Sequence, residues 1–348
     1  MQLRTASAAD AAALYALWAR AFDAPLMVPV YESDDGRLGR TVLAVAPGRD
    51  GAVLASVYWT PRVVTSADGT RALRAGCVAN VAAAPEARGR GLVRRALAVA
   101  LEQMAAVGTD VALLFTGTPG VYRSSGFETF GVPVLTGPPR PAPTTPDLPA
   151  PDLLDDRPAG PPAVRVDRLP GDPWDQGWGP ALPWRALARL HDAADTGDDG
   201  RRRPLATVRT EDHWQRRVPL WFRSCELLTA RATGGEVIGY VVLEPGPTLR
   251  VRELAVDPAA PGHPAATTAL ADAALARARH HRAASVEVRL PQDAAGLAFA
   301  RAVLAEATPS VDATGMLRPV GAGRAEVDAL RGSPSAVGAG FHWPGDYV

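Results

Sequence analysis

Apolar residues near the start of the chain recur at the spacing of a helix. Between residues 7 and 22, SAADAAALYALWARAF, the large apolar side chains from Leu14 to Phe22 stand three or four positions apart, which places them on one helix face. Ser7 and Asp10 precede them at the spacing of a capping box. The pattern predicts one amphipathic helix, preceded by a short strand.

The next hydrophobic runs have the character of strands. TVLAVAP and AVLASVYWTPRVV are rich in β-branched residues, and ALRAGCVANVAAAP is apolar at most positions, as in a strand buried on both faces. A turn rich in glycine and arginine follows, and a helix runs from it to about Ala106. The sequence then predicts a strand at DVALLFTG and a short helix and return strand at YRSSGFETFG.

Prolines then crowd the stretch from Gly137 to Pro162, which excludes a helix or a central strand and favours an extended connector. Helical and strand-like runs return after it in the same order as in the first half. We therefore expect two tandem α/β folds, over residues 1–136 and 163–348, joined by a linker over 137–162.

Composition and charge narrow the classes of function. The chain of 348 residues carries 37 basic and 37 acidic side chains, and every basic one is arginine. A neutral chain is a poor candidate for general binding to nucleic acid or to an anionic membrane. The bias toward Ala, Arg, Gly and Pro suggests an actinobacterial source. Neither a signal peptide nor a membrane-spanning run is evident, so we expect a cytoplasmic protein.

Arginines and glycines occur together at the start of one predicted helix, in APEARGRGLVRRAL, residues 84–97. The N–H groups of a helix N-terminus can hold a pyrophosphate, with arginines adding charge. A phosphate loop of the Gly-x-x-x-x-Gly-Lys type is excluded because the chain has no lysine. A dinucleotide fingerprint is excluded because Arg94 stands where a third glycine is needed.

This stretch resembles the acyl-CoA pyrophosphate loop, Arg/Gln-x-x-Gly-x-Gly/Ala, of the GNAT superfamily of N-acetyltransferases. VYRSSGFETFG is similar to that family's Tyr-x-x-x-Gly-Phe signature, here Tyr122, Gly126 and Phe127. Within the superfamily, AGCVANVAAAPEARGRGLVRRAL most resembles the tandem-domain Eis-like (enhanced intracellular survival) branch. Val93 departs from the motif, which has Gly or Ala there, and we expect this chain to lack that branch's third, sterol-carrier-like domain.

The resemblance implies two GNAT folds, each a twisted mixed and mainly antiparallel sheet flanked by helices. It implies acetyl-CoA as the acyl donor, bound by the first domain, and no metal. The turn of the second domain, VDPAAPGHPAATTAL, lacks the arginine and the glycine spacing, so we expect it not to bind CoA. The implied cofactor-binding residues are Val81, Ala82, Ala83, Arg88, Gly89, Arg90, Gly91, Leu92, Val93, Arg94, Gly117 and Thr118.

Acetyl transfer to an amine requires a base for the ammonium and an acid for the departing thiolate. Tyr122 is the candidate acid, because a phenol keeps its proton at neutral pH. The central strand carries no carboxylate where relatives often have a catalytic Glu, and its Asn80 can only order a water. In the Eis-like branch the terminal carboxylate enters the active site, so Val348 is the candidate base, with His342 as the alternative.

The acceptor is expected to be a small cationic amine, such as an aminoglycoside-like or other natural-product amine. An acidic loop, YESDDGR, would attract it through Glu32, Asp34 and Asp35, while Trp18, Phe22, Tyr31 and Asn80 would line its pocket. A solvated turn is the alternative for the acidic loop, and a plain core is the alternative for Trp18 and Phe22. The rival function is a catalytically idle acyl-CoA-binding sensor or scaffold, and a homo-oligomer is possible.

Overall fold

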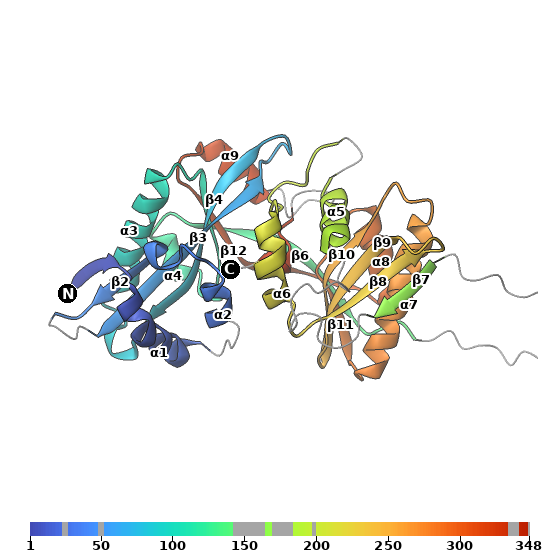
Figure 1. Cartoon of the computed structure of the whole chain (residues 1–348), viewed down its shortest axis with the longest axis horizontal. Coiled ribbons are helices and arrows are strands. Elements are labelled where there is room, and N and C mark those ends of the chain that lie inside the picture. The colour runs from blue at the N-terminus through green and yellow to red at the C-terminus, as the bar shows by residue number, and fades with distance from the viewer. Residues whose placement is uncertain are drawn as a thin grey trace, which may run out of the picture. The chain divides into compact units, whose positions relative to one another are not determined.

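The computed structural model describes residues 1–22, 27–47, 52–141, 164–168, 184–196, 200–332 and 341–346. The chain divides into two compact units (Figure 1). The first unit comprises Met1–Val132, Asp198–Trp221 and Val311–Val348, and the second comprises Pro133–Gly197 and Phe222–Ser310.

This grouping differs from the division predicted at residues 136 and 163, because two later segments join the first unit. The predicted division into domains 1–136 and 163–348 stays a prediction. Of the predicted linker, residues 137–141 are described, and residues 142–162 lie outside the described residues.

The sheet of the first unit has the strand order β1-β2-β3-β4-β5-β12. Neighbours are antiparallel except β4 and β5, which are parallel. The strands are β1 (Gln2–Thr5), β2 (Thr41–Val45), β3 (Val53–Thr65), β4 (Ala72–Ala83), β5 (Val111–Phe115) and β12 (Thr308–Pro319). The α-helices that belong to this unit are α1 (Ala11–Ala21), α2 (Met27–Glu32), α3 (Leu92–Ala106), α4 (Gly120–Arg123), α6 (Val218–Trp221) and α9 (Arg324–Gly332).

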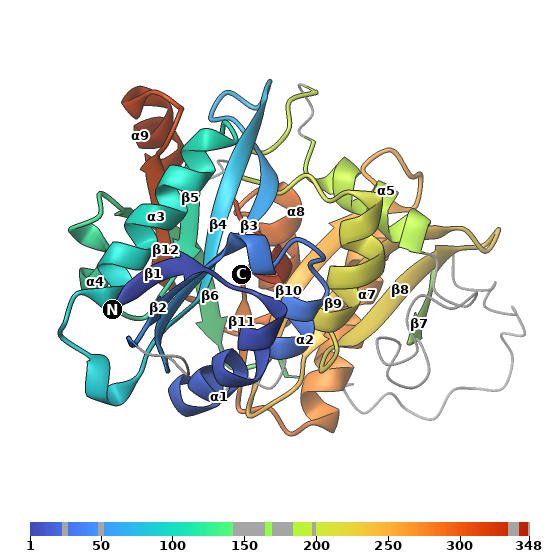
Figure 2. The ribbon, with the colours of Figure 1, turned by 60° about the vertical axis from the view of Figure 1, so that its left-hand side comes forward.

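The second unit repeats this topology in the order β7-β8-β9-β10-β11-β6, again with one parallel pair, β10 and β11 (Figure 2). Its strands are β7 (Val164–Arg168), β8 (Glu226–Ala232), β9 (Val237–Glu244), β10 (Thr248–Val256), β11 (Ser285–Val288) and the end of β6 (Glu128–Gly137). Its helices are α5 (Trp184–Ala194), α7 (His263–His280) and α8 (Ala294–Val303). The expected repetition of one mixed α/β fold is confirmed.

Each sheet is completed by a strand from the other half of the sequence. In the first unit, residues 315–319 of β12 pair with β5. In the second unit, residues 135–137 of β6 pair with β11. The sequence predicted β6 as a return strand of the first domain, but its last residues pair with β11 of the second unit.

Two hydrophobic clusters cover the opposite faces of the first sheet. Successive β2 residues point to opposite sides, so that Leu43 packs with α1 whereas Val42 packs with α3. The predicted helix over 7–22 is present as a short 3-10 turn followed by α1, and its capping box forms, with the N–H and Oγ of Ser7 both donating to Asp10. Within the described residues, no helix has the length and apolar character needed to cross a membrane.

Candidate active site

A gap opens where β4 leaves β5. The two strands pair only between Ala75–Cys77 and Val111–Leu113. Beyond this point β4 stays paired with β3, whereas β5 continues against β12. The predicted pantetheine-binding residues are Val81, Ala82 and Ala83. At these residues β4 is paired with β3 on one side only, so the backbone groups on its other side are open to a ligand.

A bulge shapes β4 just before these residues. Asn80 has a φ of 49°, and the β3–β4 register shifts between Ser56 and Tyr58 opposite it. Ser56 Oγ donates to the Asn80 carbonyl at 3.0 Å, and Trp18 Nε1 donates to Ser56 Oγ at 3.0 Å. These two hydrogen bonds link Trp18 to the bulge through Ser56 and hold the bulge in place.

The glycine–arginine turn connects β4 to α3 in an open conformation. Gly89 and Gly91 have φ values of 73° and 68°, in the left-handed region that favours glycine. A Cβ on Gly89 would meet no atom within 4 Å, and one on Gly91 would meet only Arg94 Nη2 at 3.6 Å. No side chain caps the first turn of α3, so its N–H groups are available to an anion.

The side chains around this turn divide into two sets. Leu92 is buried, and Val93, the departure from the family motif, is half-buried against the hydrophobic clusters. Arg88, Arg90 and Arg94 are exposed and form no ion pair with any described residue. Three unpaired arginines beside an uncapped helix suit a pyrophosphate.

Tyr122 lies on the short helix α4 and is 7% exposed. Its ring packs edge-on against Phe127 at a centroid distance of 6.1 Å, which links the two positions of the tyrosine signature. Burial raises the pKa of the phenol to about 12, so the hydroxyl is protonated throughout the neutral range. The predicted residues Gly117 and Thr118 follow β5 and are both exposed.

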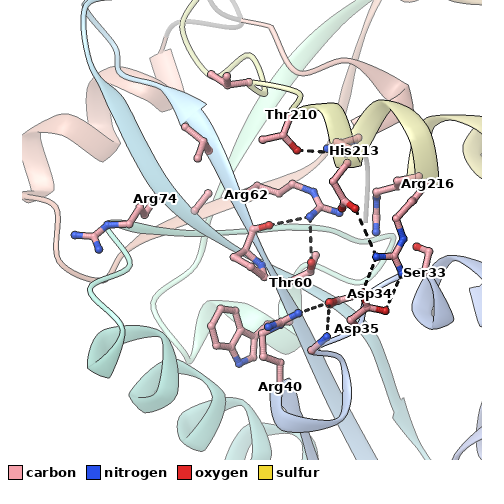
Figure 3. Close-up of a pocket in the computed structure, with 18 of the residues that line it drawn as sticks. Ser33, Asp34, Asp35, Arg40, Thr60, Arg62, Arg74, Thr210, His213 and Arg216 are labelled. Atoms are coloured by element: carbon pink, nitrogen blue, oxygen red, sulfur yellow. Dashed lines mark hydrogen bonds and ion pairs between the residues drawn. The ribbon is translucent and has the colours of Figure 1, made fainter. Parts of the chain in front are cut away.

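A cavity of about 720 Å³ opens in the first unit beside the edge of β3 (Figure 3). Its walls come from β3, the start of β4, the loop after α2 and the segment 208–217. Arg62 pairs in register with Ala75, and Thr60 pairs with Cys77, so the cavity borders the stretch of β4 before the gap. From Cys77 to Val81 the strand covers about 13 Å, which is the length of a small acceptor.

The acidic loop contributes to this cavity with its charges already paired. Asp34 accepts hydrogen bonds from Arg40 and Tyr58; burial tends to raise the pKa of Asp34, but these partners hold it below its usual value. Asp35 accepts two bonds from Arg216 at 2.7 and 2.8 Å (Figure 3).

The other predicted acceptor residues do not line the cavity. Glu32 accepts a bond from Tyr15 at 2.9 Å. Trp18 and Tyr31 are buried in the cluster around α1, with ring centroids 4.8 Å apart, and Phe22 packs against the same cluster. Their packing is that of a core, which is the alternative interpretation of Trp18 and Phe22.

The C-terminal segment Phe341–Asp346 belongs to the first unit. Phe341, His342 and Trp343 are each at most 1% exposed. His342 lies with its ring nitrogens 3.1 and 3.3 Å from the carbonyls of Leu205 and Asp346, and burial lowers its pKa. His342 does not line the cavity, and Val348, the predicted base, lies outside the described residues.

Sequence reasoning missed the contribution of residues 208–217. His213 lines the cavity, and its Nε2 lies 3.3 Å from Asp346 Oδ1, although it makes no hydrogen bond there. Burial lowers the pKa of His213 to about 3, so its imidazole is neutral. Burial would raise the pKa of Asp346, but the charge of Arg209 holds it low. Nothing local in EDHWQRRVPLWF marks this segment as part of the first unit.

No group of three His, Cys, Asp or Glu side chains suited to a metal occurs in the described part of the chain. Cys77 and Cys225 are not joined in a disulfide. Burial raises the pKa of Cys77 to about 11, which keeps the thiol protonated and unsuited to attack on a thioester.

Comparison with known proteins finds a family match in the first part of the chain and structural similarity over most of it. Residues 2–130 match the family of the acetyltransferase (GNAT) domain. A GCN5-related N-acetyltransferase from Kribbella flavida is similar in structure, with a TM-score of 0.59 and 19% identity, covering 92% of this chain and 71% of that one. Eis1 from Mycobacterium abscessus has a TM-score of 0.57 and 16% identity, covering 92% and 74%.

A probable N-acyltransferase from Enterococcus faecalis V583 is also similar, with a TM-score of 0.63 and 15% identity, covering 92% and 73%. No curated protein matches the sequence. Residues 2–130 therefore match a GNAT acetyltransferase domain, and the fold of the chain is similar to the folds of these solved structures over 92% of its length.

Proposed function

We propose that the first unit transfers the acetyl group of acetyl-CoA directly to the primary amine of a small acceptor. The observation that carries this proposal is the alignment along β4 of three features: the uncapped arginine-rich turn, the unpaired edge from Val81 to Ala83, and the cavity beside Ala75. The turn would hold the pyrophosphate, the edge would hold pantetheine, and the cavity would hold the acceptor.

The chemistry that these residues supply is positioning and proton transfer. Tyr122 would donate its proton to the thiolate of CoA as the amine attacks the thioester carbon. The narrower expectation of a strongly cationic acceptor depended on free negative charge in the acidic loop. Asp34 and Asp35 are both paired with arginines, so the cavity gives that expectation little support.

An assay of thiol release from acetyl-CoA with a panel of small amines tests this function. We expect release that depends on the amine, with a new amide detected on the acceptor by mass spectrometry. Binding of acetyl-CoA without release for any amine would instead favour the idle sensor or scaffold.

One acetyl-CoA should bind per chain. The turn before α7 has Gly262 as its N-cap and no arginine, and Asp257 accepts a bond from the Ala259 N–H within it. A carboxylate in that turn opposes a pyrophosphate. Calorimetric titration should give a stoichiometry of one, and a value of two would show that the second unit also binds the cofactor.

The terminal carboxylate of Val348 remains the proposed base, supported by the docking of Phe341–Asp346 on the first unit. A short C-terminal extension displaces this carboxylate and should lower turnover by about 10²-fold, the scale of general-base catalysis. Val348→Ala keeps a terminal carboxylate and is the matched control, with expected turnover close to the wild type. Full turnover in the extended variant would exclude the terminal carboxylate and favour a water ordered by Asn80.

A further inference from the structure

The charges that line the cavity do not balance. The carboxylates of Asp34, Asp35 and Asp212 lie within ion-pair distance of Arg40 or Arg216. Three further arginines, Arg62, Arg74 and Arg217, line the same cavity and form no ion pair with a described residue. The cavity therefore presents an excess of positive charge.

Arg217 is the most unusual of these arginines, because it is 5% exposed and makes no hydrogen bond or ion pair with any described residue. Its Nε is fully buried without a partner. Burial, followed by the nearby charge of Arg62, lowers its pKa to about 9, so the guanidinium is still charged at neutral pH. A buried charge without a partner is costly in a folded protein, and such groups are ordinarily paired.

Arg62 lies near this guanidinium on β3. Its Nη1 donates to Thr60 Oγ1 at 3.1 Å and to the Pro61 carbonyl at 2.8 Å, while its Nε is buried without a partner. Figure 3 shows the side chain of Arg62 reaching across the cavity toward His213. Two arginines with unused donors at one wall form a site for a carboxylate or a phosphate, which arginine binds through two parallel hydrogen bonds.

We propose that the acceptor carries an anionic group, a carboxylate or a phosphate, which binds Arg217 and Arg62 while its amine points along β4 toward the thioester. This inference rests on the proposed acetyl transfer and replaces a polycationic acceptor with an amino acid or an amino phosphate. The binding energy of the anion would fix the amine in place, which is how remote contacts assist transfer.

Binding of simple anions tests the site without any turnover. With acetate or inorganic phosphate as the probe at constant ionic strength, the melting temperature of the wild type should rise, and that of Arg217→Met should not. The Arg217→Met protein should itself melt about 2–4 °C higher without added anion, because an unpaired buried charge is removed.

Arg189→Met is the control, since this arginine lies outside the cavity and is paired with Glu236. Its response to the anions should equal that of the wild type. Arg62→Met is the second variant if Arg217→Met does not fold. Equal anion responses in the wild type and both test variants would overturn the proposal. So would anion binding that appears only after the last residues of the chain are removed, because the protein's own carboxylate would then occupy the arginines.

Matched acceptors test the same site during catalysis and separate the two anions. 8-Aminooctanoate is compared with 8-aminooctanamide, and an O-phosphorylated amino alcohol of similar length with the unphosphorylated amino alcohol. The anionic member of at least one pair should have the lower KM, and Arg217→Met should raise that KM by about 10–100-fold with the neutral member unchanged. Preference for the neutral members or for an aminoglycoside would contradict the proposal. Absence of turnover with every amine would count against acetyl transfer, and the anion-binding measurement would still decide the arginine site.

Discussion

Gly91→Val is expected to raise the Kd for acetyl-CoA by about 10²–10⁴-fold. Gly91 precedes α3 with a φ of 68°, and the space around its missing side chain is empty apart from Arg94 Nη2. A valine side chain would fill the space through which the pyrophosphate reaches the N–H groups of α3. The loss of two hydrogen bonds to a charged group amounts to roughly 3–6 kcal/mol, and calorimetric titration measures it as the change in Kd.

Valine is also strained in left-handed backbone, so the variant requires a control for stability. Gly235 in the β8–β9 hairpin has a φ of 85° and no atom within 4 Å of its Cβ position. Gly235→Val therefore introduces a comparable strain in the second unit and should leave the Kd unchanged. An unchanged CoA affinity in Gly91→Val would show that the turn does not bind the pyrophosphate.

Tyr122→Phe should lower turnover by about 10²–10⁴-fold without changing the Kd for acetyl-CoA. The substitution removes the proton donor and keeps the ring that packs on Phe127. Because burial raises the pKa of Tyr122 to about 12, its acidic form persists below that pH, and ionisation of this group should cause no loss of wild-type turnover near neutrality. Single-turnover kinetics isolates the chemical step.

Tyr15→Phe is the control for this variant, because it removes a phenol whose hydroxyl bonds Glu32 outside the cavity. Its turnover should match the wild type. Undiminished single-turnover rates in Tyr122→Phe would mean that solvent, rather than this phenol, protonates the thiolate.

The sequence predicted those parts of the protein that local chemistry determines. The capping box at Ser7 and the turn at Gly89 and Gly91 each depend on neighbours in sequence, and each is present. The pairing of β6 with β11 and of β12 with β5 instead joins residues far apart in the chain, and no local pattern specifies it.

The same distinction separates the two parts of the candidate site. The cofactor half lies within one continuous stretch that includes β4 and α3, so its residues could be named from motifs. The acceptor half brings β3 together with residues 208–217, which follow the predicted linker. Asp35 and Arg216 are 181 positions apart in the chain. Their ion pair neutralises a carboxylate that was expected to attract a cationic acceptor.

A crystal structure with acetyl-CoA tests the central claim most directly, because that claim is a single cofactor site built along β4. We predict one cofactor per chain, with its pyrophosphate on the N–H groups from Gly89 to Leu92 and its pantetheine beside Val81 to Ala83. Its thioester should lie within hydrogen-bonding reach of the Tyr122 hydroxyl. A cofactor bound to the turn before α7, or one whose thioester points away from Tyr122, would contradict this account.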